Sequence, residues 1–172
     1  MSPELEFVRR ETERKTHGIS AEGWLRAPQG HWNSLQILEH LMLSYTATTK
    51  GLLRTMESGE LDRSSPSTGQ HLRRFYVLGI GRFPSGVESP KQTKPKSSLR
   101  DEPLRQFNDA LVAMDATLAD AEKRFGAKTP VLRHPILGPL TGQEWRKFHW
   151  VHGQHHIKQI LALRKSLDGS GV

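Results

Sequence analysis

The 172-residue sequence predicts an all-α fold, in which residues 1–172 form a single domain built as a four-helix bundle with one long crossover connection. Apolar residues recur at spacings of three and four along several long segments, which is the period of an amphipathic helix. No stretch shows the apolar–polar alternation of a strand. The connection over residues 84–98 is longer than those common in compact domains. A helix bundle can carry such a crossover outside its core.

The first half of the chain supplies the first two predicted long helices. One spans about residues 2–16, where a Ser-Pro pair supplies the N-cap and the first helical position. A short helical turn is expected over residues 20–25. The second long helix begins near Asn33, continues to about Ser58 and stops at Gly59, a residue that favours helix termination. Its apolar face consists of Leu35, Leu38, Leu41, Met42, Tyr45, Leu52 and Met56.

The middle of the chain contains the predicted crossover. A shorter helical piece is expected over residues 71–80, and residues 84–98 follow as a Pro-, Ser- and Lys-rich segment without apolar periodicity. We interpret 84–98 as a surface linker within one domain, because neither half of the chain carries enough helices to close a core alone. The third long helix is predicted over about residues 100–125 and ends at Gly126. Its apolar stripe consists of Phe107, Leu111, Met114, Leu118 and Phe125.

The last predicted helix has the clearest start signal. Residues 127–140 are interpreted as a Pro-rich loop, and no strand is predicted there or elsewhere. A capping box, in which Thr141 and Glu144 satisfy each other's backbone N–H groups, then opens a helix that continues to about Leu167. Its apolar face consists of Trp145, Phe148, Ile160, Leu163 and Leu167.

Four of the nine histidines lie within eight residues of this helix, at His149, His152, His155 and His156. At about 100° per residue, His152 and His156 lie near the middle of the apolar face, with His149 also within it and His155 to one side. Buried imidazoles are costly unless their nitrogens have partners, and a pair four residues apart can bind one divalent ion. A hydrogen-bonded polar core, or a crevice without metal, remains an equal alternative on spacing alone.

A third ligand would have to come from another helix. His40 lies at the edge of the apolar stripe of the second helix, where a lone histidine is more often a hydrogen-bonded boundary residue. Glu39, Gln36 and Glu144 are rival donors, although each is more often a solvated or capping residue. The chain has no cysteine, so any metal must be held by nitrogen and oxygen ligands.

Two motifs resemble those of the DinB-like (DinB/YfiT) superfamily of metal-binding four-helix bundles. Residues Trp32–His40 (WNSLQILEH) resemble the opening of its second helix, and His152–Gln159 (HGQHHIKQ) resembles its last helix. The segment His134–Thr141 is similar to the lead-in of an uncharacterised branch. The resemblance covers essentially the whole chain and implies a three-histidine site. The implied ligands are His40, His152 and His156, and the implied ion is zinc or nickel.

Two positions in the last helix depart from common patterns. Ile157 and Lys158 stand where other branches carry an Arg-Gly pair, so the substrate role of that pair does not carry over. Gly153 costs about 1 kcal/mol inside a helix, and we expect close helix approach or room beside the metal to compensate. Gly153 and the loops at 26–32 and 127–140 are our candidates for the walls of a crevice that reaches the ion.

The resemblance implies a metal-dependent S-transferase that uses a low-molecular-weight thiol, or a metal-dependent hydrolase. Three neutral imidazoles leave an open position on a divalent ion, which can then lower the pKa of a bound water or thiol. The alternative is a non-enzymatic, stress-associated binding protein whose metal is structural or vestigial. No second catalytic group is predicted with any specificity, and Glu39 and His149 are the nearest guesses for a base or supporting residue.

The net charge of +7 comes mostly from the linker and from helices in which basic and acidic residues mix. No basic stripe is interleaved with aromatic residues, so a nucleic-acid accessory protein is the least favoured hypothesis. No signal peptide or membrane span is predicted, and the expected location is the cytoplasm. The resemblance makes a homodimer plausible, although the sequence shows no apolar face that requires one.

Overall fold

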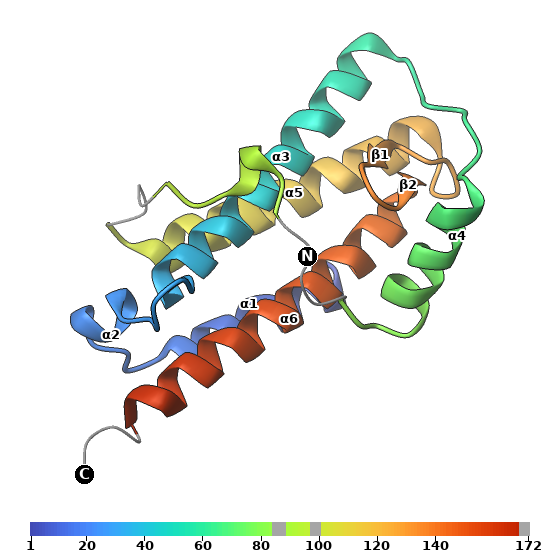
Figure 1. Ribbon diagram of the computed structural model, residues 1–172. Helices are drawn as coiled ribbons and strands as arrows, with labels where there is room; N and C mark the ends of the chain where they lie inside the picture. The colour runs from blue at the N-terminus through green and yellow to red at the C-terminus, as the bar shows by residue number, and fades with distance from the viewer. Residues whose placement is uncertain (84–88, 97–100, 169–172) are drawn as a thin grey trace.

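The computed structural model describes residues 1–83, 89–96 and 101–168, and within these the protein is mostly helical (Figure 1). The prediction of an all-α bundle is confirmed. The elements are α1 (Pro3–Thr16), α2 (Ala21–Leu25), α3 (Ser34–Ser58), α4 (Thr68–Arg74), the π-helical turn η1 (Phe75–Gly79), the 3-10 turn η2 (Lys91–Thr93), α5 (Pro103–Phe125), β1 (Leu132–His134), β2 (Gly138–Leu140) and α6 (Gly142–Asp168). Among the described helices, none combines the length and apolarity needed to cross a membrane.

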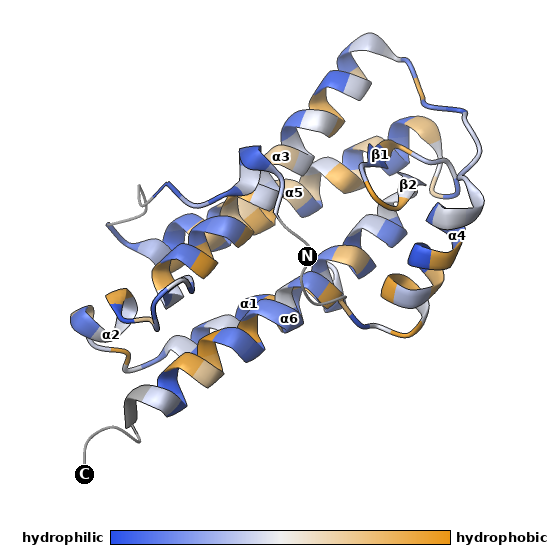
Figure 2. Ribbon diagram, in the orientation of Figure 1, coloured by the Kyte–Doolittle hydropathy of each residue, from blue (hydrophilic) through white to orange (hydrophobic). Residues whose placement is uncertain are grey.

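Four long helices form the bundle, and their most extensive packing joins α3 to α5 and α1 to α6. Figure 2 shows apolar and polar residues interspersed along these helices, as expected when one face is buried and the other solvated. Both α3 and α5 contribute fully buried side chains to the core. They are Leu38, Leu41, Tyr45 and Leu52 of α3, with Phe107, Leu111, Met114 and Leu118 of α5. These residues belong to the apolar stripes predicted for the two helices.

Local sequence signals set the ends of α3 and α6. Asn33 and Gln36 form a capping box at the start of α3, and Gly59 ends that helix in the left-handed conformation, with φ 72°. The predicted box of α6 is confirmed, because Thr141 N donates to Glu144 Oε2 at 2.9 Å and Glu144 N donates to Thr141 Oγ1 at 3.3 Å.

Two boundaries differ from the sequence-based prediction. The piece expected over 71–80 begins earlier, at Thr68, because a second capping box of Ser67 and Gln70 opens α4. The helix expected from about residue 100 begins at Pro103, and Glu102 before it is in the left-handed conformation, with φ 45°. A proline at the first helical position has no backbone N–H to satisfy and marks this later start.

The prediction that the chain has no strand is wrong. β1 and β2 pair as a short antiparallel hairpin between α5 and α6, with Leu132 opposite Leu140. Each strand has three residues, too few for an alternation to be recognised in the sequence. The turn is stabilised by His134, whose Nδ1 accepts the backbone N–H groups of Ile136 and Leu137 at 3.1 and 3.2 Å.

The crossover expected on the surface packs against α3 where it is described. Residues 84–88 and 97–98 of the predicted linker lie outside the described residues. Between them, η2 contacts α3 and buries the side chain of Thr93 to 6% exposure. Glu39 of α3, itself buried, accepts the backbone N–H of Lys96 at 3.2 Å. The described part of the crossover is therefore held against α3 by these contacts.

Gly153 marks a close approach of α6 to α1. A Cβ atom at this position would lie 2.7 Å from Val8 Cγ1, which is shorter than a van der Waals contact. Of the two compensations expected for a glycine inside this helix, close helix approach is therefore the one observed. Gly153 packs against α1 and is not among the residues that line the pocket described below.

Candidate metal centre

Three buried histidines from two helices bring their Nε2 atoms together. His40 comes from α3, and His152 and His156 come from successive turns of α6. The Nε2 atom of His152 lies 3.0 Å from that of His40 and 3.1 Å from that of His156. The structure therefore brings together the three residues that the sequence analysis named as candidate ligands.

The hydrogen bonds of the outer ring nitrogens determine which atoms carry protons. His40 Nδ1 lies 2.8 Å from the carbonyl oxygen of Thr93, and His156 Nδ1 lies 2.7 Å from Gln159 Oε1. Since these oxygens only accept, both Nδ1 atoms donate, and both Nε2 atoms present lone pairs. His152 Nε2 can donate one proton to one of its two neighbours. The lone pair of the other neighbour is then left without a hydrogen-bond donor, and a cation at the centre would satisfy it.

The spacing of the three nitrogens fits a divalent ion. Two imidazole nitrogens bound at about 2.1 Å to one ion lie roughly 3.0–3.4 Å apart, depending on the coordination geometry. The two short separations observed, 3.0 and 3.1 Å, are at the lower end of that interval. All three nitrogens lie within 4.8 Å of one another and can therefore be ligands of a single ion.

Burial keeps these histidines in the neutral form that binds metals. It lowers the pKa of His40, and it lowers the pKa of His156 to about 3, with the nearby His40 adding to the effect. The pKa of His152 is well below its ordinary value, because this ring is buried and would be repelled by charge on the other two. Metal binding therefore needs no proton to be removed from the cluster at neutral pH.

Aromatic rings surround the cluster. Phe148 stacks on His152 with ring centroids 5.5 Å apart, and Phe83 lies 5.2 Å from the same ring. Trp32 lies 5.1 Å from His40. His152 Nδ1 is buried and has no hydrogen-bond partner in the described part of the chain. Packing between rings, together with the position on α6, therefore orients this histidine.

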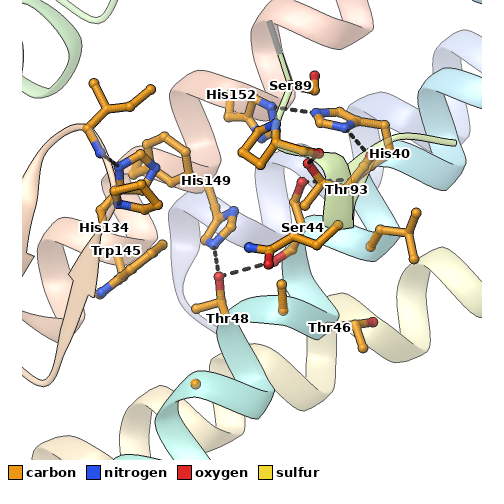
Figure 3. Close-up of a pocket in the computed structure, with 18 of the residues that line it drawn as sticks. His40, Ser44, Thr46, Thr48, Ser89, Thr93, His134, Trp145, His149 and His152 are labelled. Carbon is orange, nitrogen blue, oxygen red and sulfur yellow. Dashed lines mark hydrogen bonds between the residues drawn. The ribbon is translucent and has the colours of Figure 1, made fainter.

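A pocket of about 910 Å³ opens beside the cluster, between α3, α6, the hairpin and the η2 segment. Figure 3 shows His40 and His152 facing each other at one end of the pocket, with His134 and Trp145 toward the other. Of the predicted walls, the 127–140 loop supplies residues 132–136, whereas the 26–32 loop supplies Trp32.

His149 lines the same pocket but lies outside the three-nitrogen cluster. Its Nε2 is 3.1 Å from Thr48 Oγ1, and because that hydroxyl donates to the backbone oxygen of Ser44, it accepts from the imidazole (Figure 3). Its ring stacks on Trp145, and burial lowers its pKa to about 3. His149 is therefore a neutral, hydrogen-bonded side chain of the pocket wall.

His155 also lies outside the cluster, as the helical geometry predicted. Its Nε2 is 3.2 Å from Gln159 Nε2, and its ring lies 5.5 Å from that of Phe83. It accepts a hydrogen bond from the same amide whose oxygen orients His156. His155 therefore contributes to the surroundings of one candidate ligand.

The rival donors considered from the sequence have other roles. Glu39 bonds to the backbone of Lys96, Gln36 caps α3 with Asn33, and Glu144 caps α6. Within the residues that the structure describes, neither Glu39 nor Glu144 belongs to a group of side chains close enough together to hold one metal ion. The cluster is composed of imidazoles alone.

The sequence analysis did not predict the two hydrogen-bond partners that support the cluster. Gln159 lies three residues after His156 on the same helix, so the spacing could have identified it as a partner. Thr93 bonds to His40 through its backbone carbonyl, 53 residues away. No sequence signal marks such a contact, because every residue has a carbonyl.

Comparisons with known proteins place the chain in one family. A family model described as protein of unknown function (DUF1569) matches residues 10–162, a span that includes all three clustered histidines. No curated protein and no solved structure matches the chain.

Proposed function

The chain belongs to the DUF1569 family, and we propose that it binds one divalent metal ion through the Nε2 atoms of His40, His152 and His156. The convergence of these nitrogens, two of them with lone pairs directed at the third, is the observation that supports the proposal. Zinc or nickel is the ion we expect in purified protein, because both suit a site of imidazole ligands. The bundle and the two-helix origin of the ligands also support a DinB-like assignment, which is part of the proposal.

The proposed activity is metal-dependent, either transfer to a low-molecular-weight thiol or hydrolysis. A divalent ion with three neutral ligands supplies an open position and lowers the pKa of a thiol or water there. In the transfer, the thiol releases its proton to solvent, its sulfur bonds to an electrophilic carbon, and the leaving group departs with the bonding electron pair. Aromatic rings lie beside the cluster, and the pocket of about 910 Å³ is large enough for both reactants.

Elemental analysis and zinc titration of untagged protein test the metal site. We expect about one ion per chain. Replacement of one ligand, as in His40→Ala, should abolish stoichiometric binding, whereas His155→Ala should retain it because that ring is outside the cluster. Equal zinc binding by wild type and His40→Ala would refute the site.

Turnover with metal-loaded and metal-stripped protein tests the activity. A panel of low-molecular-weight thiols with electrophilic acceptors, and of hydrolysable esters and amides, should reveal a product only with loaded protein. His152→Ala should abolish that turnover while far-ultraviolet circular dichroism shows the helices intact. If loaded protein is inert across the panel, the alternative of a non-enzymatic binding protein replaces the enzyme proposal. The cytoplasmic location and the homodimer remain predictions.

A further inference from the structure

The charged side chains that line the pocket have one sign. Four of the lining residues are lysine or arginine, namely Lys50, Arg54, Lys94 and Arg133. No aspartate or glutamate is among the lining residues that the structure describes. The pocket is therefore electropositive before any metal is added.

Two of these cations lie at the end remote from the histidine cluster. Lys50 and Arg54 follow His40 on α3 by ten and fourteen residues, and these three residues line the same pocket. A helix rises about 1.5 Å per residue, so the backbone positions are separated by roughly 15–21 Å. The pocket therefore has a three-histidine end and a cationic end.

Lys50 and Arg54 also differ from Arg133 in their partners. Arg133 forms an ion pair with Asp62 and bonds to Ser64, so its charge is largely neutralised within the protein. For Lys50 and Arg54, no ion pair is found with the residues that the structure describes. Both side chains are exposed at the pocket and remain able to bind an anion.

The wall between the two ends is mixed in character. Ala47 and the indole ring of Trp145 contribute apolar atoms to this wall. The Ser44 hydroxyl, which donates to the carbonyl oxygen of His40, can still accept a hydrogen bond. Such a wall suits the uncharged middle of an elongated molecule, because it neither repels apolar groups nor leaves polar groups without partners.

We infer that this pocket binds an elongated small molecule whose carboxylate or phosphate group lies at Lys50 and Arg54 while its other end reaches the three-histidine cluster. The inference rests on the proposed metal-dependent function for the chemistry at the cluster. The net charge of +7 favours the approach of an anion from solution, and the two exposed cations supply the local attraction.

Calorimetric titration at low ionic strength tests the inference with ω-mercaptooctanoate and ω-mercaptooctanol, two thiols of matched length that differ in charge. We expect wild-type protein, both metal-loaded and metal-stripped, to bind the acid about fivefold more tightly than the alcohol, as one or two screened ion pairs would give. Lys50→Gln/Arg54→Gln should bind both probes equally and keep the wild-type affinity for the alcohol. Arg63→Gln/Lys123→Gln removes the same charge outside the pocket and should retain the preference.

The outcomes separate the two proposals. Three results would overturn the anion inference. Wild type could bind acid and alcohol equally, Lys50→Gln/Arg54→Gln could keep the preference for the acid, or neither probe could bind. A preference that both double variants lose would also overturn it, because net charge rather than the pocket would then be responsible. If the protein binds metal but shows no preference for the acid, the metal proposal stays intact. If it prefers the acid but binds no metal, the metal proposal fails and the anion inference remains supported.

Discussion

At the scale of single residues, the three histidines of the cluster are held in different ways. His40 and His156 each have a hydrogen-bond acceptor on Nδ1, whereas His152 is positioned by packing against Phe148 and has no such acceptor among the described residues. A partner on the outer nitrogen fixes both the tautomer and the ring orientation of a metal-binding histidine. The affinity of the site should therefore depend on the two acceptors as well as on the ligands.

Replacing Gln159 tests this dependence. Gln159→Ala removes the acceptor for His156 Nδ1, so zinc affinity should fall by about 10–100-fold while the stoichiometry is kept. Gln159→Glu keeps an acceptor at this position and should restore most of the affinity. Competition against a fluorescent zinc chelator measures both values. Equal weakening by the two substitutions would show that Gln159 acts through packing, not through its hydrogen bond.

Gly153 allows a second test at this scale. Gly153→Ala gains about 1 kcal/mol of helix propensity, but its Cβ would overlap Val8, and overpacking typically costs about 1–3 kcal/mol. We expect a net loss of about 1 kcal/mol in the free energy of unfolding, measured by urea denaturation. In a Val8→Ala background the overlap is removed, and Gly153→Ala should become stabilising. If Gly153→Ala changed the free energy of unfolding equally in the wild-type and Val8→Ala backgrounds, the close contact between Gly153 and Val8 would be contradicted.

At the scale of elements, the hairpin and α6 show how neighbouring segments support the pocket. The hairpin supplies residues 132–136 to the pocket wall, and the carbonyl of Leu132 accepts the indole N–H of Trp145 at 3.1 Å. On a neighbouring face of α6, Arg146 donates to Asp115 at 2.6 Å and to Glu122 at 2.8 Å on α5. These contacts fix the first turns of α6 between the hairpin and the bundle.

The hairpin should make the protein sensitive to acid. Burial lowers the pKa of His134 from 6.5 to about 4 in the folded protein, so the unfolded chain binds the proton more readily. The resulting contribution to stability is fully present above the unfolded value and is lost as the pH falls from about 6.5 toward 4. His134→Asn offers Oδ1 as a replacement acceptor for the turn and does not titrate.

Urea denaturation at pH 7 and pH 5 measures the effect. Wild type should lose more of its free energy of unfolding between these two values than His134→Asn does, even though other buried histidines contribute to both. Identical losses in the two proteins would show that His134 is not responsible for the acid sensitivity.

At the scale of the whole molecule, the cluster lies between two helices that are not each other's main partners. α3 packs mostly on α5, and α6 packs mostly on α1, while the cluster joins α3 to α6. An ion held there would connect the two helix pairs of the bundle. Because it binds the folded chain in preference to the unfolded one, it would also stabilise the fold.

Thermal unfolding measures this link. Zinc at 100 times its Kd should add about 2.7 kcal/mol, which for a domain of this size raises Tm by roughly 5–10 °C. His152→Ala should lose the increase, and His71→Ala, on the remote helix α4, should retain it. A Tm that does not respond to zinc in wild type would contradict a site that spans the bundle.

The long helices and their ends were predictable because their causes are local. Apolar periodicity, the capping box of Thr141 and Glu144 and the terminating Gly59 each act within about one helical turn. The same locality explains why His152 and His156 could be paired from their spacing of four residues. His40 was added through a resemblance of motifs, since nothing local connects it to α6.

Apart from the hairpin, the features that were not predicted arise from contacts between segments far apart in the chain. The hairpin is too short to show a period, and the burial of Thr93 and its bond to His40 depend on how the crossover folds back onto α3. The partner of Gly153 is Val8, on the first helix. The cationic end of the pocket depends on which lysines and arginines the bundle places on one wall, whereas the sequence shows only an excess of positive charge along the chain. Composition gives the sign of that charge, but only packing brings it to the same cavity as the three histidines.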